Sequence, residues 1–284
     1  MVKSVRIVGA GLIGTSVALA LKAEGVEVEI IDQDSAAQML ARDLVQATSI
    51  ENPEVILLAL PVSQIFGVLK SESSLYPNSI LMDVGSTKSE LQVHVDELSE
   101  IRNRFIGTHP MAGREVSGPT AARADLFVGR AWPVIKSTYT SSDAIEKARE
   151  IIALCGATAY EMSAESHDRS VSVLSHLPQI VSSVLATQLS VLNEDELLLA
   201  GQGIRDLTRL AGSDKKMWLD ILRSNRHFII HALNSLGESL DHVLDALTSD
   251  DDKYLEKLLI DGKVQQQRIS GKHGARPRDY SFVN

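Results

Sequence analysis

Short apolar runs alternate with stretches of helical spacing over the first 162 residues. Val5 to Val8 is an apolar run of strand length, and Leu12 to Ala23 carries apolar residues at helical intervals. Further runs of strand character lie at 26–31, 55–60, 79–84, 104–108, 131–135 and 158–161. The run that ends at Pro61 is continuously apolar, which is typical of a strand buried on both faces. This alternation predicts a doubly wound α/β fold of Rossmann type, with helices on both faces of a parallel sheet.

The pattern changes after about Met162, where strand signals stop and helical spacing dominates. Apolar residues recur at helical intervals from Val171 to Leu189, and Pro178 within that run is expected to kink or break the helix. Two more helices are expected over 215–233 and 235–247. A last helix is expected to start in the capping, acidic segment 249–252 and to run to about Arg268.

The chain therefore divides into three parts. We expect a dinucleotide-binding α/β domain at 1–162, an all-helical domain at 163–270 and a polar, basic, mobile tail at 271–284. Helical domains with long apolar helices often pair with a second copy of themselves. A homodimer formed through this domain is the expected assembly.

Composition and charge exclude some classes of protein. The chain has 284 residues and a formal net charge of −9, which argues against a nucleic-acid partner, because phosphates demand a basic surface. We find no apolar run of the roughly 18 residues that span a bilayer. A strand that begins near Val5 leaves no room for a cleavable signal peptide, so we expect a cytoplasmic location.

A glycine-rich turn follows the first strand. Its glycines have distinct expected roles: the first permits a tight turn, the second lets the backbone approach a pyrophosphate, and the third lets the helix pack on the strand. Asp32 ends the second strand, where a carboxylate accepts hydrogen bonds from ribose hydroxyls and repels a 2′-phosphate. We therefore expect NAD to be preferred over NADP. The expected cofactor-binding residues are Gly9, Gly11, Leu12, Ile13, Gly14, Asp32 and Pro61.

His109 is the candidate catalytic base. It directly follows a strand that is expected to end at the ligand-binding edge of the sheet, and a histidine there can accept a proton from an alcohol as hydride leaves. Ser86 follows another strand and has two interpretations. It donates a hydrogen bond to a substrate hydroxyl or to His109, or it caps the helix that follows. Both roles can coexist.

The helical domain contributes further candidates. His176 lies close to Pro178, where a broken helix frees backbone groups and marks a special site. Arg205 and Arg209 are four residues apart, and arginine binds carboxylates bidentately. The alternatives are a packed polar residue for His176 and a surface ion pair with Asp206 for the arginines.

Several motifs together resemble the prephenate/arogenate dehydrogenases of tyrosine biosynthesis. They are Gly9-x-Gly11-x-x-Gly14, Asp83-x-Gly85-Ser86-x-Lys88, His109-Pro110-Met111-Ala112-Gly113-x-Glu115-x-x-Gly118, His167-Asp168, Ser175-His176-Leu177-Pro178 and Arg205-Asp206-x-Thr208-Arg209. The resemblance covers most of the chain. Two of these motifs are specific to the family: the one that begins at His109-Pro110 and the one from Arg205 to Arg209.

The resemblance implies an oxidative decarboxylation without a metal. NAD takes hydride from the ring carbon that carries the hydroxyl, carbon dioxide leaves the quaternary ring carbon, and the ring becomes aromatic. His109 polarises the hydroxyl and takes up its proton, and Ser86 orients the hydroxyl or the histidine. Arg209 binds a substrate carboxylate, with His176 supporting the site and Arg205 assigned to the same substrate site.

Gln179 stands where many members of that family carry a second histidine. A neutral side chain there favours tolerance of arogenate, which carries an amino group, over strict use of prephenate. Two other readings stay open. One is a β-hydroxyacid or imine reductase of similar two-domain build, with Lys215 or Lys216 as a candidate base. The other is a non-catalytic NAD-sensing or scaffold protein, which needs the glycines and Asp32 but neither His109 nor Arg209.

Overall fold

The computed structural model describes residues 1–113 and 118–270. The α/β region contains β1 (Ser4–Val8), α1 (Leu12–Ala23), β2 (Glu27–Ile31), α2 (Ser35–Val45), β3 (Val55–Leu58), α3 (Val62–Leu75), β4 (Ile80–Asp83), α4 (Ser89–Asp96), β5 (Phe105–Thr108), the 3-10 turn η1 (Pro119–Ala121), β6 (Ala131–Ile135), α5 (Ser142–Leu154) and β7 (Thr158–Met162). Helices follow: α6 (Ala164–Val171), the π-helical turn η2 (Ser172–His176), α7 (Leu177–Gln188), the 3-10 turn η3 (Leu189–Val191), α8 (Glu194–Leu197), α9 (Gln202–Thr208), the 3-10 turn η4 (Arg209–Gly212), α10 (Lys215–Ser224), α11 (Arg226–Thr248) and α12 (Asp252–Ser270).

The seven strands form one sheet in the order β2-β1-β3-β4-β5-β6-β7. Strands β1 to β5 are parallel, and their register places Val8 beside Leu58, Leu58 beside Asp83, and Asp83 beside Gly107. The carboxyl ends of β1, β3, β4 and β5 therefore lie along one edge of the sheet. The loops that leave this edge carry the glycine turn, Ser86 and His109.

The predicted parallel sheet is confirmed for β1 to β5, but one pair of strands departs from it. β6 runs antiparallel to β5, and β7 is parallel to β6. Between β5 and β6 the described residues contain the short turn η1 and no α-helix. A parallel neighbour needs a crossover connection, usually a helix, so a chain without one re-enters the sheet from the edge it has just left.

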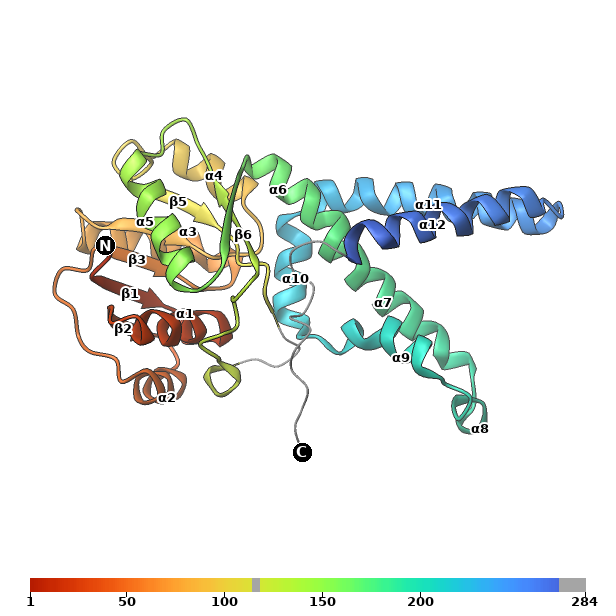
Figure 1. Cartoon of the computed structure of the whole chain (residues 1–284), viewed down its shortest axis with the longest axis horizontal. Coiled ribbons are helices and arrows are strands. Elements are labelled where there is room, and N and C mark those ends of the chain that lie inside the picture. The colour runs from red at the N-terminus through yellow and green to blue at the C-terminus, as the bar shows by residue number, and fades with distance from the viewer. Residues whose placement is uncertain (114–117, 271–284) are drawn as a thin grey trace.

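Apolar side chains alternate between the two faces of the sheet. On β3, Val55 and Leu57 belong to one buried cluster with side chains of α1, α2 and α5, whereas Ile56 and Leu58 belong to a second cluster with side chains of α3 and α4. Both faces are therefore covered, as the continuous apolar run predicts. Figure 1 shows the sheet enclosed between these helices.

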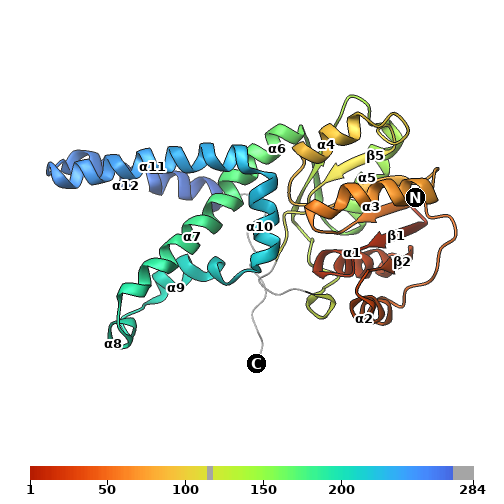
Figure 2. The ribbon, with the colours of Figure 1, turned by 180° about the vertical axis from the view of Figure 1, so that it is seen from behind.

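The helical region extends away from the sheet as two arms (Figures 1 and 2). One arm is the pair α11 and α12, which lie side by side, and the other is α7 with α8 and α9. α10 returns toward the α/β region and packs on α3, where the backbone N–H of Ser63 donates to Asp220 Oδ2 at 3.0 Å. No helix in the described part of the chain is long and apolar enough to cross a membrane.

Helix boundaries at 215–248 differ from the prediction. Instead of helices over 215–233 and 235–247, the chain forms α10 and α11 with a break at Asn225. The Asn225 side chain is buried and donates to the backbone oxygen of Asp168 at 2.8 Å and to His176 Nδ1 at 3.0 Å. These long-range bonds fix Asn225 outside helical geometry, which a local pattern cannot reveal.

The expected disturbance near Pro178 is present as the π-helical turn η2. The wider turn lies just before Pro178, which occupies the first turn of α7. A proline is tolerated there because the first N–H groups of a helix have no partner within the helix. π-helical turns are frequent at functional sites, and His176 is the last residue of this one.

Candidate active site at the domain junction

The glycine turn packs tightly against the end of β3 and leaves space in front of α1. Gly9 has φ +115°, and a Cβ there would lie 2.2 Å from the carbonyl oxygen of Ala59. A Cβ on Gly14 would lie 2.0 Å from the carbonyl oxygen of Gly9. A Cβ on Gly11 would meet no atom of the described residues within 4 Å. The turn therefore requires glycine at 9 and 14, while position 11 faces open space.

The N-terminus of α1 and Asp32 lie together at this edge. Gly11 is the N-cap of α1 and supplies no side-chain cap, so the positive end of the helix has donors for an anion. Asp32 Oδ2 accepts from the backbone N–H of Ala10 at 2.7 Å, which joins the end of β2 to the glycine turn. Leu12 and Ile13 begin α1, and Pro61 precedes α3 at the end of β3. A dinucleotide fits these residues: its pyrophosphate at the helix and a ribose at the carboxylate.

His109 is held at the end of β5 by the adjacent strand β6 and by a buried ion pair. Its backbone N–H donates to the carbonyl oxygen of Pro133 at 3.1 Å. Beneath it, Lys88 Nζ forms an ion pair with Asp83 and donates to the carbonyl oxygen of Thr108 at 2.8 Å. Lys88 and Asp83 are fully buried, and burial lowers the pKa of Lys88 and raises that of Asp83, each against the pull of its partner.

A chain of hydrogen bonds connects His109 to the helical domain. His109 Nδ1 lies 2.9 Å from His167 Nε2, and His167 Nδ1 lies 2.7 Å from Asp168 Oδ1. His167 and Asp168 come from α6 and are buried. The two domains therefore meet at the candidate base.

Asp168 also caps α4 of the α/β domain. Its carboxylate accepts from the backbone N–H groups of Lys88 at 2.9 Å and Ser89 at 2.7 Å. The interpretation of Ser86 as the cap is therefore wrong, because α4 begins at Ser89 and its cap comes from the other domain. Ser86 is partly exposed, and no hydrogen bond joins it to His109 among the described residues.

The charges around His109 keep its imidazole neutral. Burial is the main cause of a pKa well below 6.5, and electrostatic interactions with His167, Lys88 and His176 lower it further. Burial alone would raise the pKa of Asp168, but hydrogen bonds from His167 and Ser89 outweigh it and lower that pKa. A neutral imidazole that is linked through His167 to the ionised carboxylate of Asp168 is suited to accept a proton.

His176 belongs to the same junction. Its ring is buried, accepts at Nδ1 from Asn225 at 3.0 Å and meets the Trp218 ring edge-on at 6.0 Å. Burial lowers the pKa of His176 to about 4. Because Nδ1 accepts, the ring proton lies on Nε2, which makes His176 a hydrogen-bond donor.

The arginine candidates lie on a separate segment that α7 holds in place. Gln179 Nε2 donates to the carbonyl oxygen of Leu210 at 2.8 Å, and Ser182 Oγ accepts from the backbone N–H of Ala211 at 3.1 Å. These bonds fix η4, which begins at Arg209. Arg209 and Arg205 are exposed, and the Arg205 side chain donates to the carbonyl oxygen of Ala200 at 3.2 Å. Asp206, the expected ion-pair partner, accepts from Gln202.

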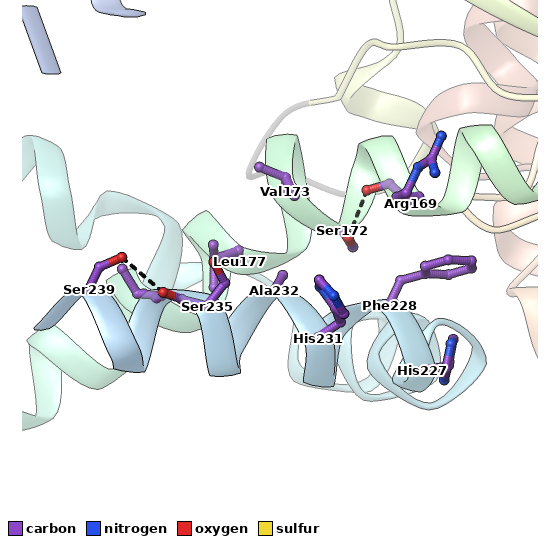
Figure 3. Close-up of a pocket in the computed structure, with 11 residues that line it drawn as sticks. Arg169, Ser172, Val173, Leu177, His227, Phe228, His231, Ala232, Ser235 and Ser239 are labelled. Carbon is purple, nitrogen blue, oxygen red and sulfur yellow. Dashed lines mark hydrogen bonds between the residues drawn. The ribbon is translucent and has the colours of Figure 1, made fainter. Parts of the chain in front are cut away.

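A groove of about 550 Å³ lies between α6, η2 and α7 on one side and α11 on the other (Figure 3). His231 and Phe228 of α11 line it opposite Ser172 and Val173. None of the predicted site residues lines this groove. It is distinct from the junction where His109 lies.

Reasoning from the sequence did not assign four residues that the structure places in the junction around His109: His167, Asp168, Lys88 and Asn225. His167 and Asp168 form an adjacent pair within the motifs quoted above, as does Lys88. That pair was a usable signal, since a histidine beside a carboxylate is a common way to orient a base. Asn225 stands in an ordinary helical pattern and gave no signal.

The fold and the site define a two-domain dinucleotide-binding oxidoreductase with a candidate histidine base, His109, where the domains meet. The model of the prephenate dehydrogenase nucleotide-binding domain matches residues 17–161, and the model of the prephenate dehydrogenase dimerization domain matches residues 163–261. The chain belongs to the prephenate dehydrogenase family.

Similar proteins align with nearly the whole of this chain. A prephenate dehydrogenase of Lactococcus lactis subsp. cremoris is 30% identical over 294 residues, covering 99% of this chain and 81% of the relative. A cyclohexadienyl dehydrogenase of Zymomonas mobilis is 27% identical over 292 residues, covering 97% and 99%. The crystal structure of prephenate dehydrogenase from A. aeolicus in complex with hydroxyphenyl propionate and NAD+ aligns with a TM-score of 0.87 at 26% identity, covering 95% of this chain and 99% of that chain.

Proposed function

We propose that this chain catalyses the oxidative decarboxylation of prephenate, or of arogenate, with NAD as the oxidant, in tyrosine biosynthesis. The observation that carries the proposal is the position of His109. It lies at the same edge of the sheet as the glycine turn and contacts the helical domain through His167. Family membership gives the reaction class, and this geometry gives the base that the reaction needs.

NAD, when bound, accepts the hydride that leaves the substrate ring. Gly9, Gly11 and the first residues of α1, Leu12 and Ile13, would hold the pyrophosphate, and Asp32 would bind a ribose. Gly14 keeps α1 close to the turn, and Pro61 borders the site from β3. The carboxylate of Asp32 disfavours the 2′-phosphate of NADP.

The residues of this chain orient the substrate and handle its hydroxyl proton. His109 accepts the proton of the ring hydroxyl as the carbon–oxygen bond gains double-bond character, and returns it to the phenolate oxygen once carbon dioxide has left. Ser86 and the Nε2–H of His176 orient the hydroxyl or a substrate oxygen. Arg209, with Arg205 on the adjoining turn of α9, binds a substrate carboxylate. Aromatisation supplies much of the driving force, so positioning and a base suffice.

Gln179 favours tolerance of arogenate. Its amide nitrogen is bound to Leu210, and its Oε1 is buried without a hydrogen-bond partner among the described residues. A buried acceptor without a partner is costly, and the ammonium group of arogenate is a suitable donor. A histidine at this position would instead add positive charge when protonated.

Initial rates of NADH formation test the proposal. Purified protein is given prephenate or arogenate, each with NAD and with NADP. We expect turnover with NAD, weaker turnover with NADP, and activity on arogenate that falls in Gln179→His. NAD binding without turnover of either substrate would contradict the proposal and favour the reductase or the sensing protein. Lys215 and Lys216, the bases that the reductase would need, are exposed at the start of α10.

We also propose a homodimer formed by the helical domain. Its arm carries exposed apolar side chains that a single copy leaves in water, such as Leu240, Leu244 and Leu247 on α11 and Leu259 on α12. The match to a dimerization domain supports the same pairing. Light scattering is expected to give twice the 30.9 kDa chain mass, and Leu244→Glu to shift it toward one chain. A wild-type monomer would contradict this proposal.

A further inference from the structure

His167 and Asp168 have a more specific arrangement than packing requires. The rings of His109 and His167 meet edge-on, with centroids 5.1 Å apart and an interplanar angle of 69°, so that one ring nitrogen of each faces the other. The far nitrogen of His167 faces Asp168. Each of these side chains is buried at the junction or borders it. The two hydrogen bonds that link them are 2.9 Å and 2.7 Å long.

The donors and acceptors of this chain can be assigned in order. The ionised Asp168 carboxylate only accepts, so His167 Nδ1 carries a proton and donates it. A neutral imidazole has one donor and one acceptor, so His167 Nε2 accepts from His109 Nδ1–H. His109 Nε2 then holds a lone pair. No described residue is hydrogen-bonded to that atom.

We propose that Asp168 and His167 are positioning residues that hold His109 in the tautomer protonated at Nδ1, which makes Nε2 the atom that accepts the substrate proton. The role of Nε2 as base rests on the proposed function, whereas the tautomer itself does not. Asp168 caps α4 with the same carboxylate, so this tautomer is set only when the helical domain is docked on the α/β domain.

The titratable groups around the hydrogen bonds from His109 to Asp168 define a competing tautomer of His109. Lys88 and Asp83 lie beneath His109, His176 faces it from η2, and Asp168 faces His167 from α6. If His167 were doubly protonated, it would donate to His109 Nδ1 and leave the proton of His109 on Nε2. That tautomer has no lone pair for the substrate and is the opposite of the one proposed.

Nitrogen NMR of the full-length protein, labelled at its histidines, separates the two states without any turnover. Comparison with His109→Asn identifies the His109 signals. We expect Nδ1 of His109 to give the shift of a protonated ring nitrogen and Nε2 that of an unprotonated one. A protonated Nε2 at neutral pH would overturn the proposal. A protein that shows the expected tautomer but turns over neither prephenate nor arogenate would overturn the proposed function alone.

Two substitutions of His167 test the role in catalysis. The amide oxygen of His167→Gln can accept from His109 Nδ1–H in place of Nε2, whereas His167→Leu fills the space with no acceptor. General acid–base catalysis typically contributes 10² or more, so we expect kcat to fall about 100-fold in His167→Leu and less than about tenfold in His167→Gln, with KM for NAD unchanged. The exposed His242→Gln is the control and is expected to match wild type.

A purely structural role of His167 predicts a different relation between the kcat values of the two variants. Losses of equal size in His167→Gln and His167→Leu, or a wild-type tautomer signature of His109 in His167→Leu, would overturn the proposal. If His167→Leu fails to fold, the nitrogen signals of His109 in wild type and in His167→Gln still test the proposal. The proposal requires a protonated Nδ1 on His109 in both proteins.

Discussion

At the scale of single residues, His109 is defined by what surrounds it more than by its own type. Burial removes the water that would stabilise an imidazolium, and electrostatic interactions with Lys88 and the neighbouring histidines disfavour that charge further. The imidazole of His109, the proposed base, therefore stays neutral at pH values where a free histidine is half protonated. Its readiness to accept a proton is a property of the folded junction.

The pH dependence of the rate tests this electrostatic account. The pKa of His109 is lowered, so the active neutral form persists as pH falls through 6.5 and is lost only well below it. We expect kcat/KM for prephenate to be level from about pH 8 to about pH 6.5 and to fall only in more acid solution. The measurement is the initial rate of NADH formation across this range, in a buffer of constant ionic strength.

His109→Asn supplies the baseline for that experiment. It is expected to bind NAD as wild type does and to lose at least about 100-fold in kcat, because asparagine cannot take up the proton. An acid limb centred at or above pH 6.5 would mean that the imidazole is not protected from protonation as the structure indicates.

At the scale of elements, the glycine turn and α1 form one unit with β3. Gly14 is required by packing, whereas Gly11 is adjacent to open space. The two positions therefore separate stability from cofactor binding, although both belong to the same motif.

Alanine substitutions test this separation. In Gly14→Ala the new Cβ would lie 2.0 Å from Gly9 O, so we expect the protein to be destabilised by about 1–3 kcal/mol and NAD binding to weaken. In Gly11→Ala we expect wild-type stability and NAD affinity reduced about tenfold or more, because the methyl group occupies the approach of the pyrophosphate. Urea unfolding and NAD titration measure the two effects.

Gly67→Ala is the matched control. Gly67 is exposed on α3, and a Cβ there would meet none of the described atoms within 4 Å. This variant is expected to keep NAD affinity and to gain about 0.5–1 kcal/mol of stability, as helical Gly-to-Ala changes do. Wild-type NAD affinity in Gly11→Ala would refute the assignment of the open space to the cofactor.

Local patterns predicted elements well where the boundaries are local. The helix expected at Leu12–Ala23 and the strand at Ala131–Ile135 have the observed bounds, because a turn or a change of period marks each end. The break at Asn225 and the reversed direction of β6 were not predicted. Both depend on partners distant in sequence: Asp168 and His176 for the break, and the missing crossover helix for the strand.

The candidate site divides in the same way. His109 and the glycines were found because strand ends in a parallel sheet share one edge. The chain from His109 to Asp168 could not be derived, since it depends on how α6 docks on the other domain. The capping pattern also offered Ser86 as a candidate cap of α4, whereas the carboxylate of Asp168, from the other domain, takes that place.

At the scale of the whole molecule, the two domains are joined by buried polar groups. Across the junction, Asp168 accepts from the first backbone N–H groups of α4, and Thr87 Oγ1 donates to Ser224 Oγ at 2.9 Å. On the helical side, Asn225 bonds to Asp168 and His176 and holds them in place. Such networks are stabilising while every member keeps its hydrogen-bond partner, and protonation of His176 at Nδ1 would remove the acceptor for Asn225. The junction is therefore expected to weaken in acid.

His176 makes that expectation quantitative. Its pKa is about 4 in the folded chain and 6.5 in the unfolded one, so the unfolded state binds more protons between these values. Stability from this group is complete above pH 6.5 and falls by about 3 kcal/mol as pH drops toward 4. We expect urea unfolding of wild type to show this loss and His176→Gln to show a smaller one. An identical pH dependence in both proteins would contradict the assignment.

The most direct test of the central claim is the ratio of carbon dioxide released to NADH formed, measured with prephenate labelled in its ring carboxylate. The account predicts one carbon dioxide for each NADH in wild type, and neither product above background in His109→Asn. NADH formed without carbon dioxide would show simple alcohol oxidation and would contradict the proposed function.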